Sequence, residues 1–130
     1  MQGTARGTFV ISMVPAPPEL GGRVDRFDFT KVFQGDLEAT GTGLMLSRGN
    51  PESGSAGYVA IETVDGRLGS RSGGFVLQQL GILRNAAQTL HYEVLLGSGH
   101  GGLLGIAGTF HLAVDPDGTH RYSLEYEPPD

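Results

Sequence analysis

An alternation of apolar and polar residues with a period of two recurs in eight segments, and it constrains this chain more than any other feature. Successive side chains of a β-strand point to opposite faces, so this period predicts strands with one buried face. Turn-forming residues separate the segments, and glycine accounts for 22 of the 130 residues. The predicted strands cover residues 7–14, 23–33, 36–48, 57–65, 73–80, 88–96, 108–114 and 119–127.

Prolines, glycines and aspartates mark the predicted connections. We expect loops at residues 15–22 and 49–54, a tight turn at Asp65-Gly66 and a hairpin turn at residues 115–118. One stretch leaves two structures open, because residues 76–96 also carry leucines at a spacing close to that of a helix. A glycine in the middle of this stretch disfavours the helix, and its flanking aromatic and β-branched residues favour strands.

Eight short strands without a clear helix predict a single all-β domain over residues 1–130. A chain of 130 residues has the size of one domain and can bury a core of its own. Unpaired strand edges promote aggregation, so a sheet of eight twisted strands usually closes on itself or folds into a sandwich. We expect an antiparallel eight-stranded barrel, whose interior is either filled by side chains or wide enough for one small ligand.

Charge and composition exclude several functions. The formal net charge is −5, and the nine basic residues, eight arginines and Lys31, are scattered along the chain. Binding to nucleic acid or to an anionic membrane needs clustered positive charge, so we expect neither partner. The chain has no cysteine, no apolar run of transmembrane length and no signal-peptide pattern at Met1, so we expect a cytoplasmic location.

Two patterns that resemble known sites are better explained as ordinary structure. Residues 97–102 match G-x-G-x-x-G, but glycines at 105 and 108 leave no room for the helix that a dinucleotide site requires. The four histidines show neither the strand spacing nor the H-E-x-x-H pattern of metal ligands, so we expect no metal and no cofactor. His91 and His111 would meet only if their strands were neighbours.

Glu62 is the candidate for acid–base chemistry. It shares its strand parity with Tyr58 and Val64, while Val59 and Ile61 lie on the other parity. If the face of Glu62 is the interior, burial disfavours the charged carboxylate and prepares a general acid or base near neutral pH. If that face is the solvent side, Val59 and Ile61 belong to the core instead.

Candidate ligand-binding residues lie on the expected inner faces of other strands. Gln78 and Gln79 are adjacent, so one of them must point inward, where its amide can orient a ligand or satisfy a backbone group. A buried tyrosine likewise needs a hydrogen-bond partner, either a ligand or a backbone group. The candidates are Tyr58, Gln79, Tyr92, Tyr122 and Tyr126, together with Phe27 and Phe29.

Six motifs follow one another along nearly the whole chain. They are GDLEATGTG at 35–43, YVAIE at 58–62, GRLGSRSGGFVLQ at 66–78, GSG at 97–99, LLGIAG at 103–108 and YSLEY at 122–126. In this order they resemble the bacterial domain-of-unknown-function family 3224. The resemblance implies a calycin-like barrel similar to allene oxide cyclase and related in shape to dirigent proteins. Barrels of this kind enclose apolar pockets, often oligomerise and can direct a ring closure without a cofactor, but the resemblance implies no settled activity.

The chain departs from this family pattern at two places. Gln79 stands where a histidine usually follows the Phe-Val-Leu-Gln run. Val10 and the run at residues 11–14 replace an acidic residue and a tryptophan in the first strand. If those polar groups serve the usual ligand, this chain handles a different and more apolar one.

We therefore expect the barrel to hold an apolar small molecule, as a cofactor-free isomerase, cyclase or lyase. Glu62 would act as the acid or base, and a dry, preorganised cavity would supply most of the catalysis. Two alternatives stay open: a carrier or sensor that does not convert its ligand, and a structural barrel with a filled interior. The outward parity is more apolar than a monomer usually exposes, which predicts a homo-oligomer. The residues concerned are Leu44, Leu46, Val59, Ile61 and Leu95.

Overall fold

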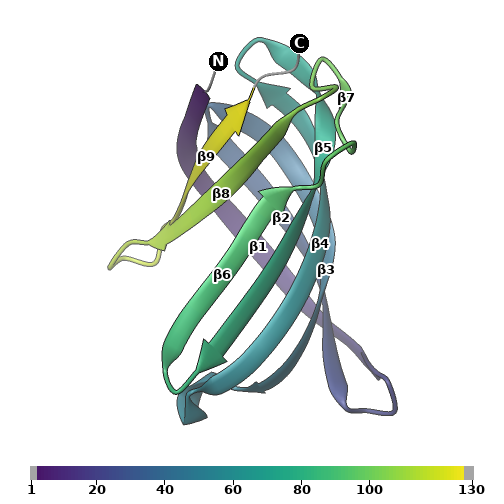
Figure 1. The fold of residues 1–130 in the computed structure, drawn as a ribbon, viewed down its shortest axis with the longest axis vertical. Coiled ribbons are helices and arrows are strands. Elements are labelled where there is room, and N and C mark those ends of the chain that lie inside the picture. Colours follow the sequence, from purple (N-terminus) through teal and green to yellow (C-terminus); the bar gives the residue numbers. More distant parts are fainter. Residues whose placement is uncertain (1–2, 128–130) are drawn as a thin grey trace.

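The chain folds into a closed antiparallel β-barrel with almost no helix (Figure 1). A computed structural model describes residues 3–127. A short 3-10 turn, η1 (Pro51–Ser53), follows the third strand. The strands are β1 (Gly3–Glu19), β2 (Val24–Gly35), β3 (Leu37–Asn50), β4 (Ser55–Leu68), β5 (Arg71–Arg84), β6 (Ala87–Val94), β7 (His100–Gly101), β8 (Ala107–Val114) and β9 (His120–Glu127). The predicted all-β class and the eight-stranded antiparallel barrel are confirmed.

The barrel closes because β4 pairs with β5 and β9 pairs with β1, while the short β7 adds to the start of β5. The closure between β6 and β8 rests on one residue pair, Glu93 with Thr109, and these strands diverge toward the lower end of Figure 1. His91 and His111 therefore lie on neighbouring strands, but no ladder joins their positions. His111 instead lies 3.4 Å from a carboxylate oxygen of Glu125.

Two predicted connections are wrong, because the strands run through them. Asp65-Gly66 is not a turn, since both residues pair with β3 on one side and with β5 on the other, and the chain reverses at residues 69–70. The prolines at residues 15–18 belong to β1, whose register against β2 shifts between Ala16 and Glu19. A proline lacks the N–H that a strand ladder needs, which explains a bulge at this place.

The helix that residues 76–96 left open does not form. β5 and β6 make a hairpin there, with Asn85 and Ala86 at its tip. Both tip residues have positive φ, 51° and 65°, and this pair of angles is typical of the two-residue turns whose twist matches that of the flanking strands. The hairpin turn predicted at residues 115–118 is present, and the Gly118 N–H donates to the carbonyl of Asp115 at 2.9 Å.

Apolar side chains fill one half of the barrel, which we call the closed half. Its centre is Phe33, whose ring lies 5.6–6.2 Å from the rings of Phe9, Phe110 and Tyr122, measured between centroids. The chain between β6 and β8 covers this end and places two fully buried side chains inside, Leu103 and Ile106. The G-x-G-x-x-G stretch at 97–102 leads into this cover as turns and β7, without a helix.

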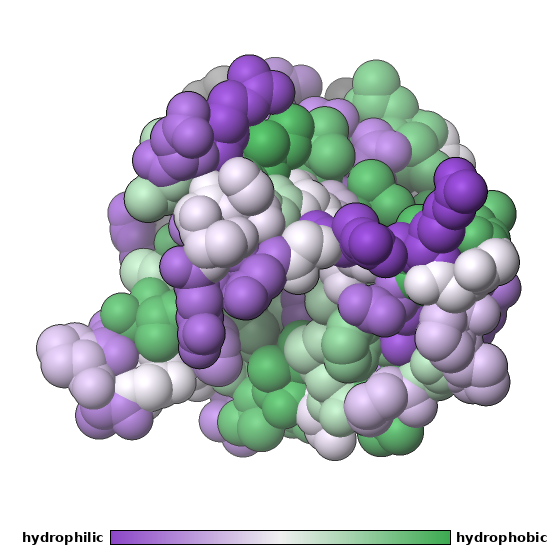
Figure 2. Space-filling view, turned by 90° about the horizontal axis from the view of Figure 1, so that it is seen from below, coloured by the Kyte–Doolittle hydropathy of each residue, from purple (hydrophilic) through white to green (hydrophobic). Residues whose placement is uncertain are grey.

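The other half of the interior, around Met13, Met45 and Ala60, is less filled, and we call it the open half. Strands β1 to β6 extend past the shorter β8 and β9 at this end (Figure 1). Figure 2 looks at the molecule from this end, where polar and apolar side chains are mixed at the surface. Among residues 3–127, no helix is long and apolar enough to cross a membrane.

Candidate functional site

Three polar side chains meet inside the barrel and form a closed triangle. Lys31 Nζ donates to Glu62 Oε1 at 2.9 Å and to the hydroxyl oxygen of Tyr92 at 3.0 Å. The Tyr92 hydroxyl in turn donates to the same Glu62 oxygen at 2.6 Å. The exposed fractions of the three residues are 5%, 3% and 2%. We call this cluster the Lys31–Glu62–Tyr92 triad, and it joins β2, β4 and β6.

Strand parity and two glycines of β3 make room for the triad. Lys31 and Glu62 both point inward, and Gly41 lies between their strands in the ladder, opposite Lys31. A Cβ atom at Gly41 would lie 2.8 Å from Glu62 Oε2, and one at Gly43 would lie 2.5 Å from the ring of Phe29. β3 therefore carries no side chain at the two inward positions where the carboxylate and the ring need the space.

The charges of the triad compensate each other, but one carboxylate oxygen lacks a hydrogen-bond donor. The ammonium and the carboxylate neutralise each other, and the rings of Phe9, Phe29, Phe33 and Tyr92, centred 5.0–5.9 Å from Nζ, also favour a cation there. Glu62 Oε2 is buried and has no hydrogen-bond partner among residues 3–127. Burial, and then the adjacent Glu62 carboxylate, raise the pKa of Tyr92 well above its usual value, so Tyr92 stays a neutral donor.

A cavity of about 170 Å³ lies in the open half, and Lys31 forms part of its wall. Glu62 and Tyr92 do not line this cavity, so they would reach its contents through Lys31. A second hollow of about 340 Å³ shares Met45 and Tyr58 with the first. The remaining wall of the inner cavity consists of Phe9, Ile11, Met13, Phe29, Met45, Tyr58, Ala60, Gln79, Leu112 and His120.

Three of the predicted ligand-binding residues lie in this wall: Tyr58, Gln79 and Phe29. Burial raises the pKa of Tyr58 above its usual value, and a hydrogen bond with Gln79 opposes this shift in part. Gln79 is the glutamine that points inward, whereas the amide of Gln78 donates to Glu93 outside the barrel at 3.2 Å. Phe27 lies one inward position from Phe29 and is half-buried.

Two other predicted residues, Tyr122 and Tyr126, lie away from the cavity. The Tyr122 hydroxyl accepts from the Leu37 N–H at 2.9 Å and donates to the carbonyl of Gln34 at 3.0 Å, so it holds the connection between β2 and β3. Tyr126 packs over Gly3, near the same end of the barrel. Alternation correctly places both rings on inner faces, but it does not give their height along the barrel axis.

Glu62 itself faces the interior, and the alternative orientation is wrong. Val59 and Ile61 are 49% and 47% exposed, so the outward face of β4 carries apolar side chains that are exposed to solvent in a single chain. Lys31 was not among the predicted site residues and was counted only among the scattered basic ones. The signal was present, since Lys31 shares the parity of Phe29 and Phe33 in the same strand.

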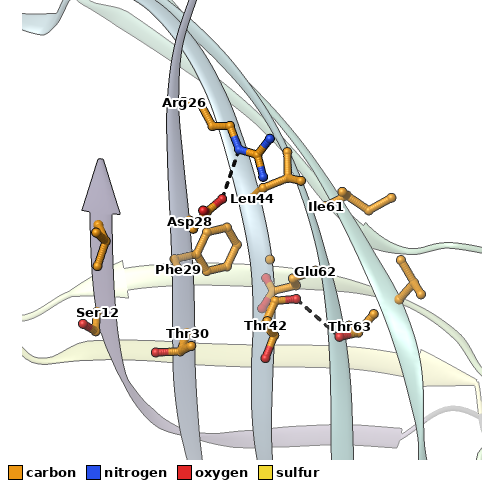
Figure 3. Close-up of a pocket in the computed structure, with 13 residues that line it drawn as sticks. Ser12, Arg26, Asp28, Phe29, Thr30, Thr42, Leu44, Ile61, Glu62 and Thr63 are labelled. Atoms are coloured by element: carbon orange, nitrogen blue, oxygen red, sulfur yellow. Dashed lines mark hydrogen bonds and ion pairs between the residues drawn. The ribbon is translucent and has the colours of Figure 1, made fainter. Parts of the chain in front are cut away.

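The outer face of β1 to β5 carries a broad groove of about 680 Å³ (Figure 3). Four hydroxyl side chains cross it in one row, and Leu44 and Ile61 lie in the next row. The hydroxyl row consists of Ser12, Thr30, Thr42 and Thr63. Within residues 3–127, no three or more histidine, aspartate or glutamate side chains gather as metal ligands would.

Comparisons with known proteins agree on the family but assign no activity. No curated protein matches the chain. A crystal structure of a protein with unknown function from Shewanella oneidensis MR-1 superimposes with a TM-score of 0.91 at 37% sequence identity, covering 100% of this chain and 99% of that one. That protein is from the DUF3224 family, and residues 5–126 of this chain match the same family, described as "Protein of unknown function (DUF3224)". The chain therefore belongs to the DUF3224 family.

Proposed function

We propose that this protein binds a small, mainly apolar molecule in the open half of the barrel, with one oxygen of that molecule accepting a hydrogen bond from Lys31. The observation that carries the proposal is a buried lysine side chain in the wall of a mainly apolar cavity. An ammonium group has three N–H donors, and Glu62 and Tyr92 accept two of them. The third has no hydrogen-bond partner among residues 3–127, so a ligand oxygen can take it.

The charge of the site favours an uncharged ligand. Lys31 and Glu62 form a neutral pair, so a ligand carboxylate would meet the Glu62 charge as well as the ammonium group. A carbonyl or hydroxyl oxygen accepts a hydrogen bond without this repulsion. Cavities of about 170 and 340 Å³, whose walls share Met45 and Tyr58, suit a small ligand and support binding over a barrel with a filled interior.

Binding can be tested with hexan-1-ol, which has an apolar chain and one hydroxyl group. We expect saturable chemical-shift changes in NMR spectra at the backbone amides of Ala60 and Gln79, both in the cavity wall. Ala60→Leu should weaken binding by about tenfold or more, because added methyl groups in a small apolar pocket cost roughly 1–3 kcal/mol. Ala113→Leu, at an exposed position of β8, is the matched control and should bind normally.

The outcome separates this proposal from its alternatives. Shifts confined to the outer groove, or equal shifts in the Ala60→Leu protein, would contradict binding inside the barrel. The isomerase or cyclase hypothesis uses the same cavity, with Lys31 donating a proton to a substrate oxygen and Glu62 and Tyr92 acting through Lys31. A carrier would release its ligand unchanged, so analysis of a bound ligand after incubation distinguishes the two functions.

We also propose that a second copy of the chain covers the apolar outer face of β3, β4 and β5. The exposed side chains there meet across the ladder in two rows. Arg26 and His91 end one row, and Asp28 and Glu93 end the other. Consider a two-fold axis that lies in the interface, parallel to the two rows and midway between them. This axis would place Arg26 on Asp28 of the second copy and His91 on its Glu93. The apolar residues between these ends are Leu44, Leu46, Val59, Ile61 and Leu80.

Val59→Arg tests the proposed interface, because it places an unpaired charge at the centre of the patch. We expect light scattering coupled to gel filtration to show an oligomer for the wild type and a monomer for Val59→Arg, since a buried unpaired charge costs several kcal/mol. Val10→Arg is the matched control, because Val10 is also β-branched, points outward and is 71% exposed, but lies off the patch. A monomeric wild type would overturn the proposal.

A further inference from the structure

Lys31 is the only lysine among the 130 residues of this chain, and it is buried inside the barrel. All eight other basic residues are arginines. Arginine stays protonated in proteins, whereas a lysine amine in an apolar site can lose its proton and act as a nucleophile. The chain therefore keeps its one nucleophilic side-chain amine in the wall of its inner cavity.

We propose that Lys31 forms a reversible imine with an aldehyde bound in the inner cavity. This inference rests on the proposed small-molecule binding and names the ligand class, an uncharged aldehyde with a short apolar body. The carbonyl oxygen of the aldehyde is the acceptor for the free N–H of Lys31, and the carbonyl carbon then lies next to Nζ. Four aromatic rings around Nζ exclude water from the reacting atoms.

The triad contains the base that this reaction needs. The ammonium proton passes to Glu62 Oε1 across the 2.9 Å hydrogen bond, which leaves a neutral amine and a carboxylic acid. An apolar ligand favours this transfer, because it dries the cavity and two buried charges become two neutral groups.

The reaction balances without a redox partner. The amine nitrogen bonds to the aldehyde carbon, and one proton moves from nitrogen to the former carbonyl oxygen, which gives a carbinolamine. The carbon–oxygen bond then breaks as Glu62 gives its proton to the departing oxygen, which leaves as water, and the C=N bond forms. The nitrogen then passes its remaining proton back to Glu62 Oε1, which leaves a neutral imine beside a carboxylic acid. The sum is one aldehyde and one amine giving one imine and one water.

Reductive trapping tests this directly on the folded protein. The protein is incubated with hexanal and sodium cyanoborohydride, which reduces an imine to a stable secondary amine, and is then cleaved after arginine. Residues 27–48 carry Lys31, and residues 1–6 carry the only other amine of the chain, the α-amino group of Met1. We expect the ratio of Lys31 to Met1 labelling to be about tenfold or more higher in the folded protein than in urea, because the folded site supplies orientation and a base.

The pH dependence distinguishes an activated amine from an accessible one. The titratable groups near the inner cavity are Glu62, Tyr92, Tyr58 and His120. Between about pH 7 and pH 9 an ordinary lysine gains reactivity tenfold per pH unit as it deprotonates. Proton transfer inside the Lys31–Glu62 pair takes no proton from solvent, so we expect the labelling rate of Lys31 to stay nearly constant over this range.

Controls keep this inference separate from the proposed binding function. The double variant Lys31→Met/Glu62→Gln removes the amine without leaving a buried charge, and its segment 27–48 should remain unlabelled. If hexan-1-ol shifts the cavity amides but Lys31 is labelled no faster than in urea, binding stands and the imine is refuted. If neither hexan-1-ol nor hexanal reaches the cavity, the proposed binding function and the imine are both refuted.

Discussion

Lys31→Met is expected to lower the free energy of unfolding by about 3–5 kcal/mol, because it removes one partner of a buried ion pair. Methionine has nearly the length of lysine, so little packing is lost. The carboxylate of Glu62 would keep the hydrogen bond from Tyr92 but lose its counter-ion while remaining 3% exposed. Urea unfolding of both proteins, followed by circular dichroism at one pH, measures the difference.

The double variant Lys31→Met/Glu62→Gln is the control for this interpretation. It replaces both charges by neutral groups of similar size, so most of the lost stability should return, and the coupling between the two sites should exceed about 1 kcal/mol. A loss below about 1 kcal/mol in the single variant would mean that water solvates Glu62, as in a surface ion pair. That result would contradict the buried triad.

The second large effect is a loss of stability in alkali. Burial first, and the Glu62 carboxylate second, raise the pKa of Tyr92 well above its usual value near 10. Above about pH 10 the unfolded chain therefore releases a proton that the folded chain keeps. The unfolded state is favoured by roughly 1–2 kcal/mol per pH unit for one such tyrosine, while below pH 10 the stabilisation is fully present.

Urea unfolding midpoints between about pH 9 and pH 12 measure this dependence, and phenolate absorbance gives the ionisation of the tyrosines in the same samples. Burial also raises the pKa values of Tyr58 and Tyr122, which adds to the slope. Tyr92→Phe removes one ionisable group, so its stability should fall less steeply above pH 10 than that of the wild type. Equal slopes in the two proteins would show that Tyr92 ionises freely in the folded state.

Local pattern was enough to predict the fold class. Alternation along each strand correctly placed Phe9, Phe33, Phe75 and Leu124 inside, because a strand turns every second side chain to the same face. The same rule made Tyr58, Gln79 and Phe29 candidates, and the structure places all three in the cavity wall. Strand ends were less predictable. Asp65-Gly66 has the composition of a turn, but partners on both sides continue the ladder through it.

The site was only half predictable. Glu62 was a candidate because it is a charged residue among the apolar residues on one face of its strand. Lys31 stands among the apolar residues on one face of its own strand in the same way. The sequence contains both interruptions, but the two residues are 31 positions apart, and nothing in the sequence shows that they meet. Tyr122 and Tyr126 show the complementary case, since both lie on inner faces and neither lines the cavity.

The sequence by itself determined the all-β class, which residues of each strand share a face, and the presence of polar groups that interrupt apolar faces. Only the tertiary structure decided that Lys31, Glu62 and Tyr92 form one triad and that the open volume lies beside Lys31. The physical reason is that alternation is a local property with a period of two residues, whereas barrel closure and strand register set the level of each side chain along the axis. Level along the axis decides which inward groups touch, and so where chemistry can occur.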